Sequence, residues 1–481
     1  MPMVFPQILM AACILTATGP DKMFTDVTAQ SGIPPLKYAE GVNIYDLDAD
    51  GLPELFLPDV KGRDRLFKNL GGCRFRDVTD ERGIKESGGI GGVVADLNGD
   101  GRPDIYVVRG AYPYGINVLY EQGSDGRFVD VADKAGVAGK KNGISAVAGD
   151  LDGDGLPELF VSNWGVNSLY RNTCKAGEMK FSDITKGAGL GVEGRSWGAV
   201  LGDFDGDGRL DIFVSRGGPD YKDGKDTSRL YINMGDGTFA DHTASSGIAG
   251  INWSMGAVTA DLDGDGSLDM FVTNYEGPDH LYLNDGKAHF RDVTEGSGIS
   301  SGRSVGAAAG FVDGDLLPDI VVAGFQGPVK VFENLGGGKF EDVSLAWGMV
   351  TYKKNEGVAL GDMDGDGDLD IYVANYDGHN VLYRNNLDGG SFIKVRPARG
   401  KASLAGAAVK LYRAGGLGRP DAYMARQDVQ AGYGFCSQGP DEALFRLPGD
   451  GVYDIAVTLP DGRHIERTGV KPGVLEVDFD K

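Results

Sequence analysis

Residues 202–215 read GDFDGDGRLDIFVS, and this stretch decides the fold of the chain. Four aspartates lie within nine residues of it, namely Asp203, Asp205, Asp207 and Asp211. Carboxylates crowded this closely repel one another unless a cation lies between them. A ligand set made only of oxygen suits a hard ion, Ca²⁺ above all. The stretch therefore predicts a calcium loop, and a polar surface turn is the alternative for a single copy.

The loop does not fit an EF-hand. An EF-hand needs a Glu at position 12 and flanking helices, and here that position is Val214. The flanks WGAVLGDF and LDIFVS are rich in β-branched and aromatic residues, which favour strands. Gly208 permits the left-handed turn that folds the loop back. We therefore expect a loop between two strands, with the backbone carbonyl of Arg209 and the carboxylate of Asp211 completing the ligands.

The same pattern recurs along the chain in six full copies and one degenerate copy. The full copies begin at Asp46, Asp96, Asp150, Asp203, Asp261 and Asp362, and the degenerate copy, FVDGDLLPD, begins at Phe311. Successive copies are 50, 54, 53, 58, 50 and 51 residues apart. A period of about fifty residues in an all-β sequence is typical of β-propeller blades.

We expect about six Ca²⁺ ions, one for each full copy, bound at the odd positions of the loop. These positions are Asp46, Asp48, Asp50, Leu52, Glu54, Asp96, Asn98, Asp100, Arg102, Asp104, Asp150, Asp152, Asp154, Leu156, Glu158, Asp203, Asp205, Asp207, Arg209, Asp211, Asp261, Asp263, Asp265, Ser267, Asp269, Asp362, Asp364, Asp366, Asp368 and Asp370. The second loop is expected to bind more weakly, because neutral Asn98 replaces an aspartate. The degenerate loop is expected to bind no ion, because Phe311 replaces the first ligand and Leu316 replaces the turn glycine.

Two further motifs keep the phase of the loops. A Phe-x-Asp strand precedes each loop, the first at Phe24, and a Leu-Tyr-x-Asn strand or a variant of it follows, the last at residues 382–385. The first of these strands has no hairpin partner before it, and the last has none after it. Pairing of the two would remove two open sheet edges. The sequence therefore predicts an all-β fold, a seven-bladed β-propeller closed by a clasp between the ends of the repeat region.

These motifs resemble the integrin-alpha-like FG-GAP repeats, also called VCBS repeats. The segment after them resembles the ASPIC/UnbV domain through GAAVKLYRAG (406–415), QDVQAGYGFCSQ (427–438) and VTLPDGRHIERTGV (457–470). The combination is similar to the cartilage acidic protein family and its bacterial relatives. We therefore expect a propeller over residues 24–386 and a small β-rich, ASPIC/UnbV-like domain over residues 390–481.

The N-terminal segment predicts export. Residues 4–17, VFPQILMAACILTA, are apolar but too short for a membrane span. Residues 1–20 are therefore expected to be a signal peptide, with a lipoprotein signal lipidated at Cys13 as the alternative. The expected location is secreted, periplasmic or at the cell surface.

The expected binding surface lies on the propeller face opposite the calcium loops, where the repeats differ most. The candidate residues there are Arg109, Trp164, Arg195, Trp197, Trp253, Tyr275 and Tyr376. Aromatic rings and arginine on loops above a rigid scaffold are typical interface anchors. The alternative is that these rings only cap the cores of the blades.

The composition narrows the function further. A formal net charge of −23 argues against a nucleic-acid partner, because phosphates would be repelled. The sequence contains no HExxH, GxSxG or P-loop motif and has only five histidines. We therefore expect a monomeric, non-enzymatic protein for adhesion or recognition of an extracellular protein or glycan. One alternative is a calcium-dependent enzyme, such as a polysaccharide lyase, that uses the face opposite the calcium loops. Another is a purely structural surface or matrix protein.

Overall fold

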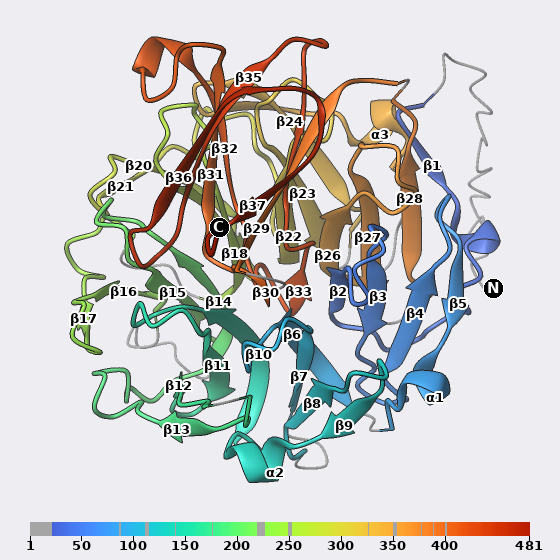
Figure 1. Ribbon diagram of the computed structural model, residues 1–481, viewed down its shortest axis with the longest axis vertical. Helices are drawn as coiled ribbons and strands as arrows, with labels where there is room; N and C mark the ends of the chain where they lie inside the picture. Colours follow the sequence, from blue (N-terminus) through green and yellow to red (C-terminus); the bar gives the residue numbers. More distant parts are fainter. Residues whose placement is uncertain are drawn as a thin grey trace, which may run out of the picture.

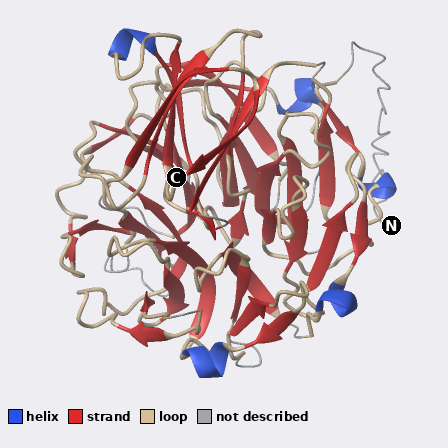
Figure 2. Ribbon diagram, viewed as in Figure 1, coloured by secondary structure: helices blue, strands red, loops and turns tan. Residues whose placement is uncertain are grey.

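The computed structural model describes residues 22–481 except 86–87, 111–114, 140, 176, 219–226, 249–252, 326, 350–353, 377, 388 and 400–401. The expected signal segment, residues 1–20 with Cys13, thus lies outside the described residues. In the described part of the chain, strands dominate the fold (Figure 2). The short helices in the described part of the chain are α1 (Thr79–Arg82), α2 (Ala132–Ala135), α3 (Ser344–Trp347) and the 3-10 turns η1 (Thr28–Gln30) and η2 (Pro420–Ala422).

Each repeat forms an antiparallel sheet of four strands, and the described residues give seven such sheets, numbered here as blades 1 to 7. Blades 1 to 3 contain β2 (Val42–Tyr45), β3 (Glu54–Leu57), β4 (Arg65–Asn69) and β5 (Phe75–Asp77); β6 (Gly89–Ala95), β7 (Asp104–Arg109), β8 (Val118–Gln122) and β9 (Phe128–Asp130); and β10 (Asn142–Gly149), β11 (Glu158–Trp164), β12 (Ser168–Asn172) and β13 (Phe181–Asp183). Blades 4 and 5 contain β14 (Ser196–Gly202), β15 (Asp211–Arg216), β16 (Arg229–Asn233) and β17 (Phe239–Asp241); and β18 (Ser254–Ala260), β19 (Asp269–Asn274), β20 (His280–Asn284) and β21 (Phe290–Asp292). Blades 6 and 7 contain β22 (Ser304–Gly310), β23 (Asp319–Gly324), β24 (Lys330–Gly336) and β25 (Lys339–Asp342); and β26 (Asn355–Gly361), β27 (Asp370–Asn375), β28 (Val381–Asn385) and β1 (Phe24–Asp26).

The sheets close into a ring. The first strand of each blade contacts the first strand of the next, and β26 contacts β2 in turn (Figure 1). In blade 7 the N-terminal strand β1 pairs with β28, with Phe24 opposite Asn385. The propeller fold and the clasp between the ends of the repeat region are therefore both confirmed. The clasp gives blade 7 its fourth strand, so that β28 is covered by an outer strand as the third strands of the other blades are.

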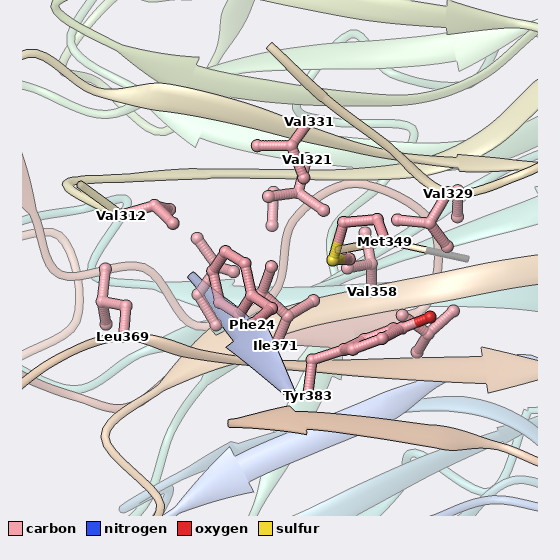
Figure 3. Close-up of a cluster of buried hydrophobic side chains, with 14 of the residues drawn as sticks. Phe24, Val312, Val321, Val329, Val331, Met349, Val358, Leu369, Ile371 and Tyr383 are labelled. Carbon is pink, nitrogen blue, oxygen red and sulfur yellow. The ribbon is translucent and has the colours of Figure 1, made fainter. Parts of the chain in front are cut away.

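Apolar side chains between neighbouring blades form the core. Phe24 of β1 lies among Val321 and Val331 of blade 6 and Val358 and Ile371 of blade 7 (Figure 3). All five side chains are almost completely buried. Burial of a side chain of this size contributes about 1.5–3 kcal/mol, so the first strand of the chain is held by packing as well as by its hydrogen bonds.

A ring of side-chain hydrogen bonds also links the blades. The Asn that ends the Leu-Tyr-x-Asn strand donates its Nδ2–H to the carbonyl at the second loop position of the preceding blade. Asn233 reaches Leu151 O at 2.8 Å in this way. The equivalent donors, at 2.8–3.1 Å, are Asn69, Gln122, Asn172, Asn284, Asn334 and Asn385. Asn69 of blade 1 donates to Met363 O of blade 7, so these hydrogen bonds link every blade to the next around the whole ring.

The residues after the propeller form two further sheets. One contains β30 (Ala402–Ser403), β29 (Phe392–Arg399) and β34 (Ala443–Arg446), with β37 (Gly473–Asp478) parallel to β29; the other contains β32 (Tyr423–Asp428), β31 (Ala408–Arg413), β35 (Tyr453–Thr458) and β36 (His464–Val470). Val395, Val409, Phe445 and Val457 contribute to their shared core. We call these two sheets the C-terminal domain.

One segment of the C-terminal domain fills the centre of the ring. Residues 431–438, with β33 (Ser437–Gln438), contact the first strand of every blade, and Ser437 pairs with Val42 of β2. The approach is so close that a Cβ on Gly256 would lie 2.4 Å from Gly434 C, and one on Gly91 would lie 2.6 Å from the Cys436 Cβ. The AGYGFCSQ stretch is therefore a plug in the axial channel of the propeller.

Candidate functional site

The acidic loops have one conformation in common, seen in the loop that begins at Asp203. Its Oδ1 accepts the Gly206 N–H at 2.9 Å, and its Oδ2 accepts the Gly208 N–H at 3.0 Å. Gly208 has a φ of 90°, so the turn that its position predicts is confirmed. The first aspartates of the other full loops accept backbone N–H groups in the same manner. The first residue thus shapes the loop through hydrogen bonds to the loop backbone.

The ninth position has a structural role that the sequence did not reveal. Asp211 is buried, and it accepts the Phe204 N–H at 3.0 Å and the Asn233 N–H at 2.8 Å. It therefore joins the loop to the third strand of its blade. The two equivalent backbone N–H groups of blades 2, 3, 5, 6 and 7 donate to the carboxylates of Asp104, Glu158, Asp269, Asp319 and Asp370. Because Asp319 belongs to the degenerate loop, this role does not depend on a complete ligand set.

The residue at position 7 of each full loop is hydrogen-bonded, through its backbone N–H, to the aspartate at position 5. The Arg209 N–H donates to Asp207 Oδ1 at 2.9 Å, and the guanidinium of Arg209 also pairs with Asp207. Leu52, Arg102, Leu156, Ser267 and Asp368 donate in the same way from their backbone N–H groups.

The loop carboxylates converge closely enough to share a cation. Ligand oxygens of Asp203, Asp205 and Asp211 all lie within 4.8 Å of one another. Comparable groups are Asp46, Asp48 and Asp50; Asp150, Asp152 and Glu158; Asp261, Asp263 and Asp265; and Asp364 and Asp370 with Cys73. Burial raises the pKa of Asp211 to about 8, and the neighbouring Asp205 and Asp203 add to the rise. Such crowded oxygen donors fit a hard divalent cation, whose charge would favour the ionised carboxylates.

In the first two loops a charged side chain from the third strand contacts the loop residues. Lys68 Nζ lies 2.6–2.9 Å from oxygens of Asp48, Asp50 and Glu54 in the first loop. In the second loop Asn98 donates its Nδ2–H to Glu121 Oε1 at 3.2 Å. Neither contact was predicted, although Lys68 and Glu121 occupy the same position of the Leu-Tyr-x-Asn strand.

The degenerate loop contacts the C-terminal domain. Phe311 lies against Phe445 with ring centroids 5.4 Å apart, and Phe311 and Leu316 both belong to the core of that domain. Leu316 takes the positive φ, 71°, that glycine takes in the other loops. The missing ligand is therefore replaced by an apolar anchor for the C-terminal domain.

Polar contacts hold the C-terminal domain over the remaining loops as well. Lys394 Nζ lies 3.2 Å from Asp362 Oδ2, and Arg426 donates to Gly266 O at 3.0 Å. The Tyr423 hydroxyl donates to Asp261, and Arg446 pairs with Asp368. The C-terminal domain thus covers the loop face of the propeller with cationic groups that complement its negative charge.

On the opposite face the predicted aromatic residues come together. The ring centroids of Trp164 and Trp197 are 5.2 Å apart, and those of Trp253 and Tyr275 are 4.7 Å apart. Phe325 extends the second group, 5.1 Å from Tyr275. Tyr376 lies 5.7 Å from Tyr38 on the far side of the ring. We call these seven rings the aromatic face.

Several cations among the described residues lie beside the aromatic face, and one of them is Lys37, whose Nζ lies 5.4 Å from the Tyr38 ring. The guanidinium of Arg195 lies 5.1 Å from the Trp164 ring. Lys61 Nζ lies 4.5 Å from the Tyr38 ring and 5.2 Å from the Tyr376 ring. Lys354 Nζ lies 5.8 Å from the Phe325 ring.

The predicted residue Arg109 ends β7 on the same side of the ring, but its charge acts on Asp64. Burial raises the pKa of Asp64 to about 7, and the guanidinium of Arg109 partly offsets this rise.

Tyr38, Phe325, Lys61 and Lys354 were not predicted. Phe325 had a signal in the sequence, because it directly follows the second strand of its blade, as Tyr275 and Tyr376 do. The plug lies beneath this face, where Phe435 and Cys436 pack together with Met255 while the predicted tryptophans lie partly buried around them. The rings therefore line a surface and also cover the apolar centre below it.

The repeats match a known family. The FG-GAP-like repeat family matches residues 46–107, 96–161, 150–214, 221–272, 261–310 and 312–373. Within the described part of the chain, no helix has the length and apolar character needed to cross a membrane.

Similarity to curated proteins extends beyond the repeats. The human cartilage acidic protein 1 is 26% identical over 95% of this chain and 75% of its own length, and the mouse protein is 26% identical over 93% and 75%. The match to the frog (Xenopus tropicalis) protein, 26% identical, covers 57% of this chain and 47% of that protein.

Solved structures with similar chains include BBS1N in complex with ARL6DN, with a TM-score of 0.48 and 13% identity over 76% of this chain and 98% of the other. The rhamnogalacturonan lyase YesW has a TM-score of 0.43 and 14% identity over 74% and 75% of the two chains. The repeated loops, the strands between them and the six matched segments lead to one conclusion. The chain belongs to the FG-GAP-like repeat family.

Proposed function

We propose that this protein is an exported, calcium-binding β-propeller that recognises an extracellular protein or glycan through its aromatic face. The observation that carries the proposal is the difference between the two faces of the ring. The C-terminal domain covers the loop face with Lys394, Arg426 and Phe445. The aromatic face lies at the other end of the blades, where the described part of the C-terminal domain supplies only the tip of the plug. A partner would therefore meet the aromatic face first.

The chemistry of the aromatic face favours an acidic partner with flat or apolar surfaces. Trp and Tyr rings supply contact area at a small cost in conformational entropy. Lys61 and Arg195 place positive charge beside these rings on a chain whose net charge is −23. An acidic sugar stacked on a ring, or an acidic protein segment, would satisfy both features.

One strained residue also supports the choice of face. Trp253 has a φ of 62°, a conformation that bulky side chains rarely adopt. Strain of this kind costs about 1–3 kcal/mol and is concentrated at functional sites. The Trp253 ring lies 4.7 Å from the Tyr275 ring in this conformation.

The calcium ions in this proposal are structural. The carboxylates of one loop, such as Asp203, Asp205 and Asp211, would hold an ion between the first and second strands of a blade. Extracellular calcium modules bind with dissociation constants of about 10⁻⁴–10⁻³ M. At about millimolar calcium each site would stabilise the fold by about 0.4–1.4 kcal/mol, which favours export to a calcium-rich compartment.

The test is binding of the whole chain to a glycan array, and to an extracellular protein extract, with calcium present. A variant with Trp164, Trp197 and Trp253 changed to Ala should lose at least about ten-fold in affinity, as expected for hot-spot residues. The matched control changes the exposed Leu70, Met234 and Leu335 to Ala on the outer hairpins. Binding that survives the triple tryptophan change, in a variant with an unchanged circular dichroism spectrum, would contradict the choice of face. Cleavage of a bound acidic polysaccharide would instead support the enzymatic alternative.

A further inference from the structure

The third residue of the Leu-Tyr-x-Asn strand faces the acidic loop of its own blade. Lys68 in blade 1 contacts the first loop, Glu121 contacts Asn98 in the second, and Arg171 lies 2.6 Å from Asp152 in the third. Blade 5 has the apolar Leu283 at this position. The charge at one strand position therefore differs from blade to blade while the loops remain nearly the same.

The contacts of Lys68 differ in kind from those of the other cations. Its Nζ lies 2.8 Å from Asp48 Oδ1, 2.6 Å from Asp50 Oδ2 and 2.9 Å from Glu54 Oε1. These three residues occupy positions 3, 5 and 9 of the loop, so one ammonium group engages three of the expected ligands. The ammonium donates hydrogen bonds to Asp48 and Asp50 and forms an ion pair with Glu54.

Burial separates Lys68 from its counterpart in blade 3. The side chain of Lys68 is 17% exposed and that of Glu54 is completely buried, whereas the side chain of Arg171 is 51% exposed. Arg171 reaches Asp152 from the rim of its loop, but Lys68 lies inside the first loop. A divalent cation and an ammonium cannot share the same three carboxylates, because the two charges would repel each other at contact distance.

We propose that Lys68 takes the place of the calcium ion in the first loop. This inference rests on the proposed calcium binding of the other full loops. The first blade is then joined by an internal charge that is present at any calcium concentration. The chain binds one ion fewer than its loop sequences indicate.

The experiment exchanges the strand residues of blades 1 and 5 in the full chain. Lys68→Leu gives the first loop the residue that the fifth loop has, and Leu283→Lys does the reverse. Bound ions are counted by native mass spectrometry at saturating calcium. Lys68→Leu should gain one ion, Leu283→Lys should lose one, and Lys68→Arg, which keeps the charge, should match the wild type.

Two results would overturn the inference. One is an unchanged ion count in Lys68→Leu, and the other is an unchanged count in Leu283→Lys. If Lys68→Leu unfolds without calcium, its refolding on calcium addition supports the inference, and failure to refold at any calcium concentration opposes it. A wild-type chain that binds no ion would oppose the calcium proposal itself. The two failures are distinguishable, because failure of the inference alone leaves ions bound to the wild type and only fails to change the count in the variants.

Discussion

Asn233→Ala is expected to lower the free energy of unfolding by about 3 kcal/mol. Asn233 is buried, and its Nδ2 donates to Leu151 O of blade 3 at 2.8 Å and to Leu210 O of its own blade at 3.1 Å. Alanine would leave both carbonyls without this donor. A buried polar group that loses its partner costs about 1–3 kcal/mol, so two such groups account for the expected loss.

The assay is urea unfolding of the full chain in saturating calcium, followed by circular dichroism. Asn233→Gln is the matched control, because blade 2 has Gln122 at the same position and Gln122 reaches Leu47 O at 3.1 Å. The Gln variant should lose less than half of what the Ala variant loses. A loss below about 0.5 kcal/mol for Asn233→Ala, or equal losses for both variants, would refute the reasoning.

Four further predictions concern metal, pH and the C-terminal domain. Excess EDTA should lower the melting temperature substantially, since several sites of about 0.4–1.4 kcal/mol each would be emptied; an unchanged melting curve would contradict calcium binding. Asp64→Asn should stabilise the protein at pH 8 by up to about 4 kcal/mol and have little effect at pH 4. The reason is that burial raises the pKa of Asp64 to about 7, so the folded chain binds a proton that the unfolded chain has released. Stability therefore falls as the pH rises from about 4 to about 7. A difference in urea midpoint between the variant and the wild type that does not change with pH would contradict this prediction. Phe311→Ala should cost about 3–5 kcal/mol and make the C-terminal domain the first target of limited proteolysis, because Phe311 is buried against Phe445; a wild-type digestion pattern would count against the apolar anchor. Gly434→Ala should destabilise the chain by at least about 1–3 kcal/mol, since Gly434 has a φ of 59° and a Cβ there would lie 2.5 Å from Ala307 O; a wild-type melting temperature would show that the plug adapts.

Much of the propeller could be predicted because the residues that determine the structure of each repeat lie close together in the sequence. Asp203, Gly208 and the strands beside them lie within about fifteen residues, and their hydrogen bonds are made within the same blade. The clasp between β1 and β28 followed from the phase of the repeats. The aromatic face was found in part, because the loops that vary between repeats were known to lie opposite the acidic loops.

The contacts of single positions could not be predicted in this way. Lys68 reads as an ordinary exposed strand residue, and only the pairing of β3 with β4 places it against Asp48 and Glu54. Phe311 reads as a lost ligand, and only the C-terminal domain shows what replaces the ion. In both cases the packing of the strands and domains determines which residues the side chain contacts, and no local sequence pattern indicates them.

The sequence by itself determined the all-β repeat and the acidic loops, because these depend on interactions within one period or between adjacent periods. It also determined the closure of the ring, because the phase of the repeats leaves one unpaired strand at each end of the repeat region. The tertiary structure alone decided the role of residues 431–438, which contact the first strand of every blade. The axial channel exists only after all the blades have assembled, so no short stretch can encode what fills it. The same assembly decides which face of the ring the two sheets of the C-terminal domain, as far as the structure describes them, leave uncovered, and the aromatic side chains lie there.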